Sequence, residues 1–323
     1  MRYRKLGQSD IRVSEISLGC WTLGGLSWVD GVANGWADVD EREVKKAVDH
    51  ALDRGVNHFD NADVYGNGRA ERMLARVLGD RSKDVVIATK VGHFPGTAGH
   101  AYEPAHIRHQ CEQSLINLRR DHVDIYYFHH GDFGPNDAYL GDAIAVMRQL
   151  RKEGKIRLIG LSAYSPEDFL RLTPQIEPDV LESWAHAADD QFIRAGSPVR
   201  RLLDERKMSF VAFSPLQQGI LLGKYTAQNP PRFEDGDHRK DDPDFSRENL
   251  ERMGPRIDRL KSRFGPDTRS LARAALQYLL SFACVGCAIP GFRNLDQVKV
   301  NLAGADEPLG PADVEFIRET FAG

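Results

Sequence analysis

Polar side chains follow three hydrophobic runs that succeed one another in the first half of the chain. Asp60 ends one run, and Tyr65 comes soon after it in FDNADVYGNG (59–68). Lys90 ends the next run, DVVIATK, and His129 ends the one after that, VDIYYFH. A carboxylate, a phenol, an ammonium and an imidazole are groups that hold and transfer protons. We therefore predict a catalytic site if the fold brings these ends together.

Lys90 offers a way to make the Tyr65 phenol more acidic than a free phenol, whose pKa is about 10. An ammonium about 4 Å away contributes roughly 4 kcal/mol at an effective dielectric near 20, so we expect it to lower the pKa of Tyr65 by about three units. Asp60 is expected to keep Lys90 charged. His129 is expected to orient a substrate carbonyl through a hydrogen bond. The set predicts proton donation by Tyr65.

Short runs rich in Val, Ile and aromatic residues alternate along the chain with segments of helical spacing. These strand candidates are 15–20, 56–60, 84–90, 123–129, 156–162, 179–184, 208–214 and 283–289. Helices are expected at 40–55, with Asp40 as N-cap, and at 69–79, 104–118, 142–154, 165–172 and 270–282. Strand followed by helix, repeated along the chain, predicts a (β/α)8 TIM barrel, whose strand ends meet at one rim. A β-hairpin that turns at 8–10 is expected to precede the barrel.

No linker rich in Pro, Gly or Ser divides the 323 residues, so we predict a single domain over 1–323. The longest irregular segment, 226–246, follows the seventh run. Loops of this length are usually functional or disordered, and at the rim of a barrel we predict a lid. Trp21, Trp28 and the loop 91–107 are expected to shape the pocket with it. Such rim loops vary freely, so the sequence leaves the substrate open.

The composition bears on the kind of partner. The 43 basic and 47 acidic residues give a net charge of −4 and are well mixed, which favours neither nucleic acid nor a membrane surface as partner. No apolar run approaches the roughly 20 residues that span a bilayer, and no signal-peptide core is seen. We therefore expect a cytoplasmic protein that acts on a small molecule.

Cysteines and histidines give little support to a disulfide framework or a metal site. The four cysteines are few and scattered, and the pair in CVGC (284–287) is typical of a buried strand. His130 follows His129 on a strand and is expected to point to the opposite face. His186 has no Glu or Cys at ligand spacing, so we predict no metal site.

Over nearly its whole length the chain resembles the aldo-keto reductase family. The resemblance is carried by FDNADVYG, ATK and DIYYFHHGD, which match the catalytic tetrad of that family at Asp60, Tyr65, Lys90 and His129. Further matches are YRKLGQSDIRVSEISLGCW, IGLS, SPLQQGILLGKY and IPGFRNLDQVKVNL, in the family order. The resemblance implies an NAD(P)H-dependent oxidoreductase that interconverts a carbonyl compound and an alcohol.

The resemblance also implies where the cofactor binds. Ser162 matches the serine that holds the nicotinamide carboxamide, Phe213 the aromatic residue that stacks on the nicotinamide ring, and Arg293 a residue that can pair with a 2′-phosphate, which favours NADPH although NADH is possible. Ser214 and Leu216 match pyrophosphate contacts, with Gly219 in a segment whose backbone N–H groups suit anions. The full implied set is Gly19, Cys20, Trp21, Asp60, Ser162, Glu182, Phe213, Ser214, Leu216, Gly219, Gly291, Arg293, Gln297 and Asn301.

Three positions depart from the family pattern. Ala163 stands where Asn is frequent, and Gly291 stands where many members carry a phosphate-binding Lys. Glu182 replaces a common Gln, and an ionised Glu can accept hydrogen bonds but cannot donate one to the carboxamide oxygen. These changes are expected to affect cofactor binding and to leave the tetrad in place.

Two other functions are compatible with the same residues. Some proteins that resemble this family are redox-sensing partners of channels, so one alternative is a cofactor-binding regulatory subunit with little turnover. The other is a barrel lyase in which Lys90 forms a Schiff base. Asp60 beside Lys90 argues against the lyase, because it keeps the amine protonated.

Overall fold

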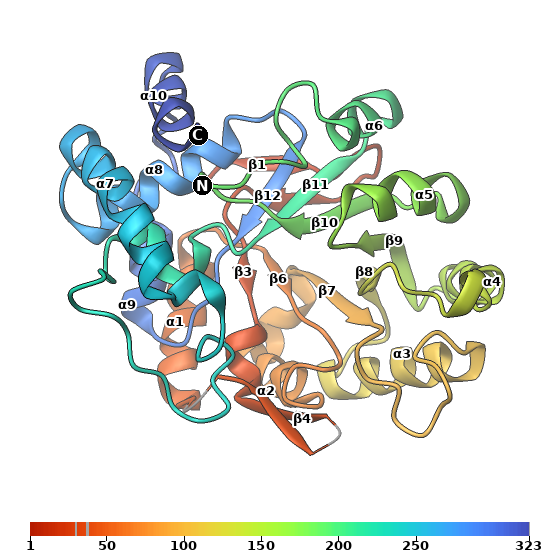
Figure 1. The fold of residues 1–323 in the computed structure, drawn as a ribbon. Helices are drawn as coiled ribbons and strands as arrows, with labels where there is room; N and C mark the ends of the chain where they lie inside the picture. Colours follow the sequence, from red (N-terminus) through yellow and green to blue (C-terminus); the bar gives the residue numbers. More distant parts are fainter. Residues whose placement is uncertain (30, 37–38, 323) are drawn as a thin grey trace.

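The computed structural model describes residues 1–29, 31–36 and 39–322, and in it eight parallel strands form one sheet in the order β12-β11-β10-β9-β8-β7-β6-β3 (Figure 1). Each strand coincides with one of the hydrophobic runs, so the predicted strands are confirmed. The strands are β3 (Leu18–Gly19), β6 (His58–Asp60), β7 (Val86–Val91), β8 (Val123–Phe128), β9 (Ile156–Ser162), β10 (Val180–Trp184), β11 (Ser209–Phe213) and β12 (Val285–Ile289).

Backbone pairing between the first and last strands closes the sheet into a barrel. The segment around β3 runs parallel to β12, through bridges that join Ile16 to Ala288 and Gly19 to Gly291. The Ala288 N–H donates to the Glu15 carbonyl at 2.9 Å, and the Gly19 N–H donates to the Pro290 carbonyl at 3.1 Å. The predicted (β/α)8 barrel is therefore confirmed.

Helices surround the barrel, and all six predicted helices are present. The Asp40 side chain caps the first of them by accepting from the Arg42 N–H at 2.8 Å. The predicted helices are α1 (Glu41–Asp53), α2 (Arg69–Leu78), α3 (Pro104–Leu118), α4 (Leu140–Lys152), α5 (Pro166–Ile176) and α8 (Thr268–Leu280). Helices that the sequence analysis did not identify are α6 (Pro198–Arg206), α7 (Arg247–Phe264), α9 (Leu295–Asn301) and α10 (Pro311–Phe321). Within the described part of the chain, no helix has the length and apolar character that crossing a membrane requires.

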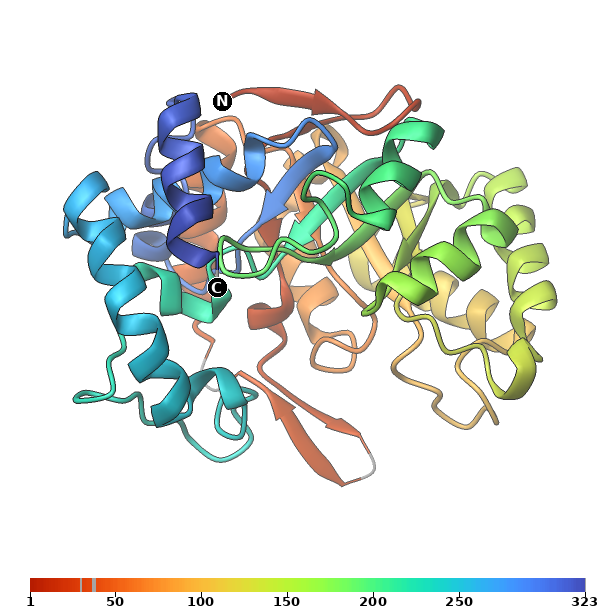
Figure 2. The same cartoon turned by 45° about the horizontal axis from the view of Figure 1, so that its top comes forward.

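The predicted N-terminal hairpin, β1 (Tyr3–Lys5) paired with β2 (Arg12–Ser14), covers one end of the barrel (Figure 2). Its residues Leu6, Ile11 and Val13 are buried and belong to the same apolar cluster as the inward-facing Ile125 and Val211 of the barrel strands. The hairpin therefore seals the end of the barrel from which the strands start, and leaves the opposite rim for a site.

A second hairpin, which the sequence analysis did not predict, lies at that opposite rim (Figure 2). It consists of β4 (Leu26–Val29) and β5 (Val32–Gly35), and a bridge joins Gly35 to Asp237 in the long segment 226–246. Trp28 lies on β4 with 60% of its surface exposed. It projects from the hairpin into solvent, so the expectation that Trp28 shapes the pocket is wrong.

Candidate active site

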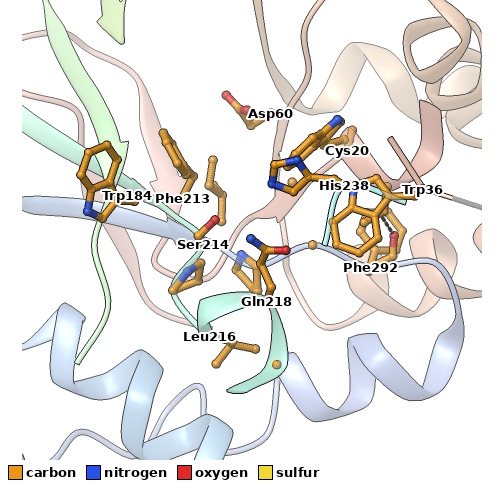
Figure 3. A pocket seen from close by; sticks show the side chains of 18 of the residues that line it. Cys20, Trp36, Asp60, Trp184, Phe213, Ser214, Leu216, Gln218, His238 and Phe292 are labelled. Carbon is orange, nitrogen blue, oxygen red and sulfur yellow. Dashed lines mark hydrogen bonds between the residues drawn. The ribbon is translucent and has the colours of Figure 1, made fainter. Parts of the chain in front are cut away.

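A cavity of about 760 Å³ opens at the rim where the parallel strands end. This volume lies in the range of pockets that enclose small ligands and cofactors. Figure 3 shows side chains from distant parts of the chain around it, among them Asp60, Phe213 and Trp36. Sixteen residues named from the sequence line the cavity: Gly19, Cys20, Trp21, Asp60, Tyr65, His129, Ser162, Glu182, Phe213, Ser214, Leu216, Gly219, Gly291, Arg293, Gln297 and Asn301.

Lys90 of the predicted tetrad lies behind the cavity wall, with 1% of its surface exposed. Its ammonium is ion-paired with Asp60, donates to the Asn61 carbonyl at 3.0 Å and lies 3.2 Å from Oε1 of Glu182. Burial lowers the pKa of Lys90, but attraction by the two carboxyls more than offsets this and raises the pKa above its ordinary value. The amine is therefore protonated, which does not suit a Schiff-base nucleophile.

Burial also reverses the expectation for Tyr65. Desolvation raises the pKa of the phenol above its ordinary value, and the Lys90 ammonium, which pulls the pKa down, only partly offsets it. The Lys90 Nζ atom lies 5.8 Å from the centre of the Tyr65 ring. The predicted lowering of the Tyr65 pKa is therefore wrong in sign. The phenol carries its proton at neutral pH, which is the state that a proton donor requires.

His129 follows β8 and faces Tyr65 across the cavity floor. The two rings lie 5.9 Å apart between centroids, with an angle of 76° between their planes. Burial lowers the pKa of His129 well below its ordinary value, and His93 and Lys90 act in the same direction. The imidazole is therefore neutral at neutral pH and has one N–H to donate.

Glu182 differs from the ionised carboxylate that the sequence analysis considered. The residue is 1% exposed, and desolvation together with the nearby Asp60 raises the pKa of its carboxyl to about 8. Its carboxyl is therefore mostly protonated at neutral pH, and a protonated carboxyl can donate as well as accept.

The wall formed by β9 to β11 carries the groups expected at a nicotinamide. The hydroxyl of Ser162 is buried, and no partner for it is found in the described part of the chain. Ala163 uses its backbone N–H to donate to the Glu182 carbonyl at 3.2 Å. Phe213 and Trp184 place their ring centroids 6.5 Å apart on the next two strands. An unsatisfied hydroxyl and a flat aromatic face in the wall of one cavity fit a ring that bears a carboxamide.

The backbone after β11 is unusual. Ser214, Gln217 and Gln218 have φ values of 51°, 45° and 51°, in the left-handed region that residues other than glycine rarely adopt. Such strain concentrates at functional sites. The Gly219 N–H donates to the Leu216 carbonyl at 2.9 Å. This amide is used within the turn, and Gly219 lines the cavity. That the segment around Gly219 suits an anion stays a prediction.

Two guanidinium groups line the cavity near Trp36. The Arg293 guanidinium is 5.7 Å from the centre of the Trp36 ring, and that of Arg239 is 4.4 Å from the same ring. Arg239 also forms a two-point ion pair with Asp237, at 2.9 Å and 2.7 Å. The Arg293 backbone N–H donates to Oε1 of Gln297 at 2.7 Å. A guanidinium group suits a phosphate, and Arg293 lines the same cavity as Ser162 and Phe213, so the residues present fit a phosphorylated dinucleotide.

Several cavity residues were not identified individually from the sequence: Thr22, Trp36, His93, Tyr164, Trp184, Gln218, His238, Arg239 and Phe292. The long polar segment 226–246 was the available signal for His238 and Arg239. The backbone N–H of His238 donates to the Gly35 carbonyl at 2.9 Å. The centroid of the His238 ring lies 4.6 Å from that of Trp21. The segment therefore joins the β4–β5 hairpin at the mouth of the cavity.

The cysteines belong to the core. All four are buried and free of disulfides, and Cys287 lies inside the barrel, with its sulfur 3.6 Å from Nδ1 of His58. In the part of the chain that the structure describes, no three His, Cys, Asp or Glu side chains are grouped as metal ligands.

Comparison with known proteins gives the family. A model of the Aldo/keto reductase family matches residues 15–321. An oxidoreductase from Mycobacterium bovis is 33% identical over 301 residues, which cover 92% of this chain and 86% of that protein. A probable voltage-gated potassium channel subunit beta from Oryza sativa subsp. japonica is 28% identical over 332 residues, covering 95% of this chain and 92% of that protein.

Solved structures agree with this match. The holo form of an aldo-keto reductase from Bacillus halodurans is similar with a TM-score of 0.76 and 25% identity, covering 100% of this chain and 97% of that one. The chain therefore belongs to the aldo/keto reductase family of nicotinamide-dependent oxidoreductases.

Proposed function

We propose that this protein reduces an aldehyde or ketone to an alcohol with NADPH, and that Tyr65 is the proton donor. One observation carries the proposal: the ends of β6 and β8 bring Tyr65 and His129 to one cavity floor, with Lys90 of β7 buried beneath them. The buried hydroxyl of Ser162 and the ring of Phe213 line the same cavity. NADPH, when bound there, supplies the hydride that reduces the carbonyl carbon.

Tyr65 donates its proton to the carbonyl oxygen as that oxygen gains negative charge. Although burial raises the pKa of the phenol, an alkoxide is a stronger base than a phenolate, so the transfer is downhill. Lys90 stabilises the phenolate that is left, because its ammonium lowers the pKa of Tyr65 relative to burial alone. The neutral imidazole of His129 donates a hydrogen bond to the same oxygen and helps to stabilise the developing charge.

Arg293 and Arg239 support NADPH over NADH as the preferred cofactor. Their guanidinium groups lie 4.4 Å (Arg239) and 5.7 Å (Arg293) from the centre of the Trp36 ring in the wall of the same cavity, where a 2′-phosphate can form charge-assisted hydrogen bonds. Asp60, whose carboxyl is buried against Lys90, keeps that lysine in place and charged.

The experiment is NADPH oxidation with a panel of aldehydes and ketones, for wild type and Tyr65→Phe, together with titrations of NADPH binding. Removal of the proton donor is expected to reduce kcat by about 10²- to 10⁴-fold while NADPH still binds. Equal turnover of the two proteins would rule out Tyr65 as the donor.

A regulatory subunit is the second candidate, because a relative of similar length is named as a potassium channel subunit beta. Tight NADPH binding by wild type with no turnover on any carbonyl of the panel would favour this candidate. Turnover that Tyr65→Phe abolishes would exclude a function limited to binding.

A further inference from the structure

A serine of the β4–β5 hairpin contacts the loop that carries Tyr65. The hydroxyl of Ser27, in β4, donates to the Val64 carbonyl at 3.0 Å and accepts from the Gly66 N–H at 2.8 Å. These two groups belong to the chain neighbours of Tyr65 on either side. A serine hydroxyl has one hydrogen and two lone pairs, so it can form both bonds at once. Ser27 is only 5% exposed, which limits the competition of water for these bonds.

Glycines allow the backbones of the two segments to approach each other. Gly66 has a φ of 59°, and a Cβ atom at this position would lie 2.1 Å from the carbonyl oxygen of Gly24, in the segment that leads into β4. A Cβ atom on Gly24 would in turn lie 2.7 Å from the Gly66 nitrogen. A larger residue at either position would push the backbones apart. The loop around Tyr65 is therefore packed directly against the base of the hairpin.

Two further side chains join the loop to the hairpin in the opposite direction. The guanidinium of Arg69, at the start of α2, donates to the Gly24 carbonyl and, at 2.6 Å, to the Leu26 carbonyl. Oδ1 of Asn67 accepts from the Trp28 N–H at 3.2 Å. Each segment therefore supplies side chains that bind the backbone of the other.

The bonds from Ser27 differ from those that Tyr65 forms itself. The Tyr65 N–H donates to the Ala62 carbonyl at 3.2 Å, and its carbonyl accepts from the Ala70 N–H at 3.1 Å. These bonds hold Tyr65 within its own loop and against the start of α2, whereas Ser27 joins the loop to the hairpin. The Val64 carbonyl also accepts from the Asn67 N–H at 3.0 Å. Removal of the Ser27 hydroxyl is therefore felt most by the Gly66 N–H.

We propose that Ser27 is a positioning residue for the proton donor, and that its hydroxyl holds the loop 64–66 so that the phenol of Tyr65 stays opposite His129 in the cavity. A shift of about 1 Å in a reacting group can reduce a rate by about a hundredfold. Ser27 lines the cavity, but its hydrogen is donated to the Val64 carbonyl, so it acts through the loop and not by contact with the substrate. This inference rests on the proposed function, in which Tyr65 donates the proton.

The test compares wild type with Ser27→Ala in NADPH oxidation and NADPH binding. We expect kcat to fall by about ten- to a hundredfold while the Kd of NADPH stays unchanged. The solvent deuterium isotope effect on kcat should rise, because proton transfer becomes slower relative to the other steps. Ser27→Thr keeps the hydroxyl and suits a strand, so it is expected to recover most of the wild-type kcat.

Ser9→Ala is the matched control. The Ser9 hydroxyl donates to the Leu6 carbonyl at 2.7 Å and accepts from the Ile11 N–H at 3.2 Å, so its removal takes away the same kinds of bonds from the N-terminal hairpin, at the other end of the barrel. Its kcat is expected to equal that of wild type. Wild-type kcat in Ser27→Ala would overturn the inference. So would a loss of NADPH affinity without a loss of kcat, or a loss of kcat that Ser27→Thr shares in full.

Amide hydrogen exchange of the segment 64–68 requires neither cofactor nor turnover. In Ser27→Ala the Gly66 amide is expected to exchange at least about fivefold faster than in wild type, because it loses a hydrogen bond, and in Ser9→Ala it should exchange at the wild-type rate. Equal exchange in wild type and Ser27→Ala would contradict the role of Ser27. If wild type turns over no carbonyl compound, or Tyr65→Phe is as active as wild type, the proposed function fails, and the exchange rates alone decide whether Ser27 holds the loop.

Discussion

Tyr127 fills the space into which a side chain at position 160 would project. The two residues are partners in the register of β8 and β9, and a Cβ atom on Gly160 would lie 2.1 Å from Cδ1 of the Tyr127 ring. The Lys90 ammonium lies 5.4 Å from the centre of the same ring. Gly160 thus makes room for the ring that lies next to Lys90.

Gly160→Ala is expected to lower the free energy of unfolding by about 1–3 kcal/mol, because the fully buried Tyr127 ring must move to admit a methyl group. Turnover should fall as well, since the ring contacts Lys90. Urea denaturation and NADPH oxidation measure the two effects. Gly141→Ala is the control: Gly141 lies in α4 with open space around its Cα, and alanine there should stabilise the helix by up to about 1 kcal/mol. Equal stability of Gly160→Ala and wild type would contradict this account of the packing.

Arg293→Leu is expected to raise the Kd of NADPH by roughly ten- to a hundredfold, since a hydrogen bond to a charged group contributes about 1.5–3 kcal/mol. The Kd of NADH should change less than about twofold, because NADH has no 2′-phosphate. Isothermal titration calorimetry with both nucleotides measures the difference. Arg148→Leu removes an exposed arginine of α4 that pairs with Glu177 and should leave both affinities unchanged. An equal loss of affinity for NADPH and NADH in Arg293→Leu would argue against a contact between Arg293 and the 2′-phosphate.

The variants Trp21→Ala and Trp28→Ala distinguish the roles of two tryptophans that were both expected from the sequence to shape the pocket. Trp21 lines the cavity, with its ring 6.0 Å from that of Tyr65, so its removal should raise KM for an aromatic aldehyde by about tenfold or more, given the apolar area lost. Trp28 is 60% exposed, and its removal should change KM less than about twofold. Steady-state kinetics measure KM for both variants. A larger rise in KM for Trp28→Ala than for Trp21→Ala would mean that the β4–β5 hairpin reaches the substrate.

His58 is expected to make the stability of the protein depend on pH. Burial lowers the pKa of its imidazole to about 3, whereas the unfolded chain has a value near 6.5. The unfolded state therefore binds more protons below about pH 6.5, so the stability contributed by His58 is complete above that pH and is lost as the pH falls toward 3.

The stability of wild type relative to His58→Asn should therefore decrease by roughly 2 kcal/mol between pH 7.5 and pH 5. Denaturation curves at the two pH values measure it. The comparison with the variant removes the opposite contribution of the buried carboxyls, which is the same in both proteins. If the difference in the free energy of unfolding between wild type and His58→Asn is the same at both pH values, the pKa of His58 is not lowered by burial.

The barrel and most of the cavity wall could be predicted from sequence, because each strand is a short hydrophobic run and polar residues stand at or next to the ends of several of them. Asp60, Lys90 and His129 stand at such ends, and parallel strands bring their carboxyl ends to one rim. The β4–β5 hairpin was missed because it is short and partly exposed, so it carries little hydrophobic pattern. The contact of Trp36 with Arg239 joins segments far apart in the chain, which no local pattern records.

The pKa values were the least predictable part of the site. The sequence indicated that Lys90 lies near Tyr65, and a nearby ammonium lowers the pKa of a phenol. It could not indicate that the desolvation of Tyr65 outweighs this attraction, because burial depends on the whole fold. For the same reason the sequence suggested an ionised Glu182, whereas the structure places this carboxyl beside Asp60 on a single ammonium.

Closure of the barrel through β3 and β12 has a consequence during protein synthesis. The strands that carry the tetrad, β6 to β8, leave the ribosome early, but β12 is the last strand of the barrel to emerge. Until then β3 and β11 both have unpaired edges, which are the parts of a sheet that promote association between nascent chains. We therefore expect nascent chains to be most prone to association in the interval before β12 emerges, and slower translation of the segment between β11 and β12 to lower the soluble yield.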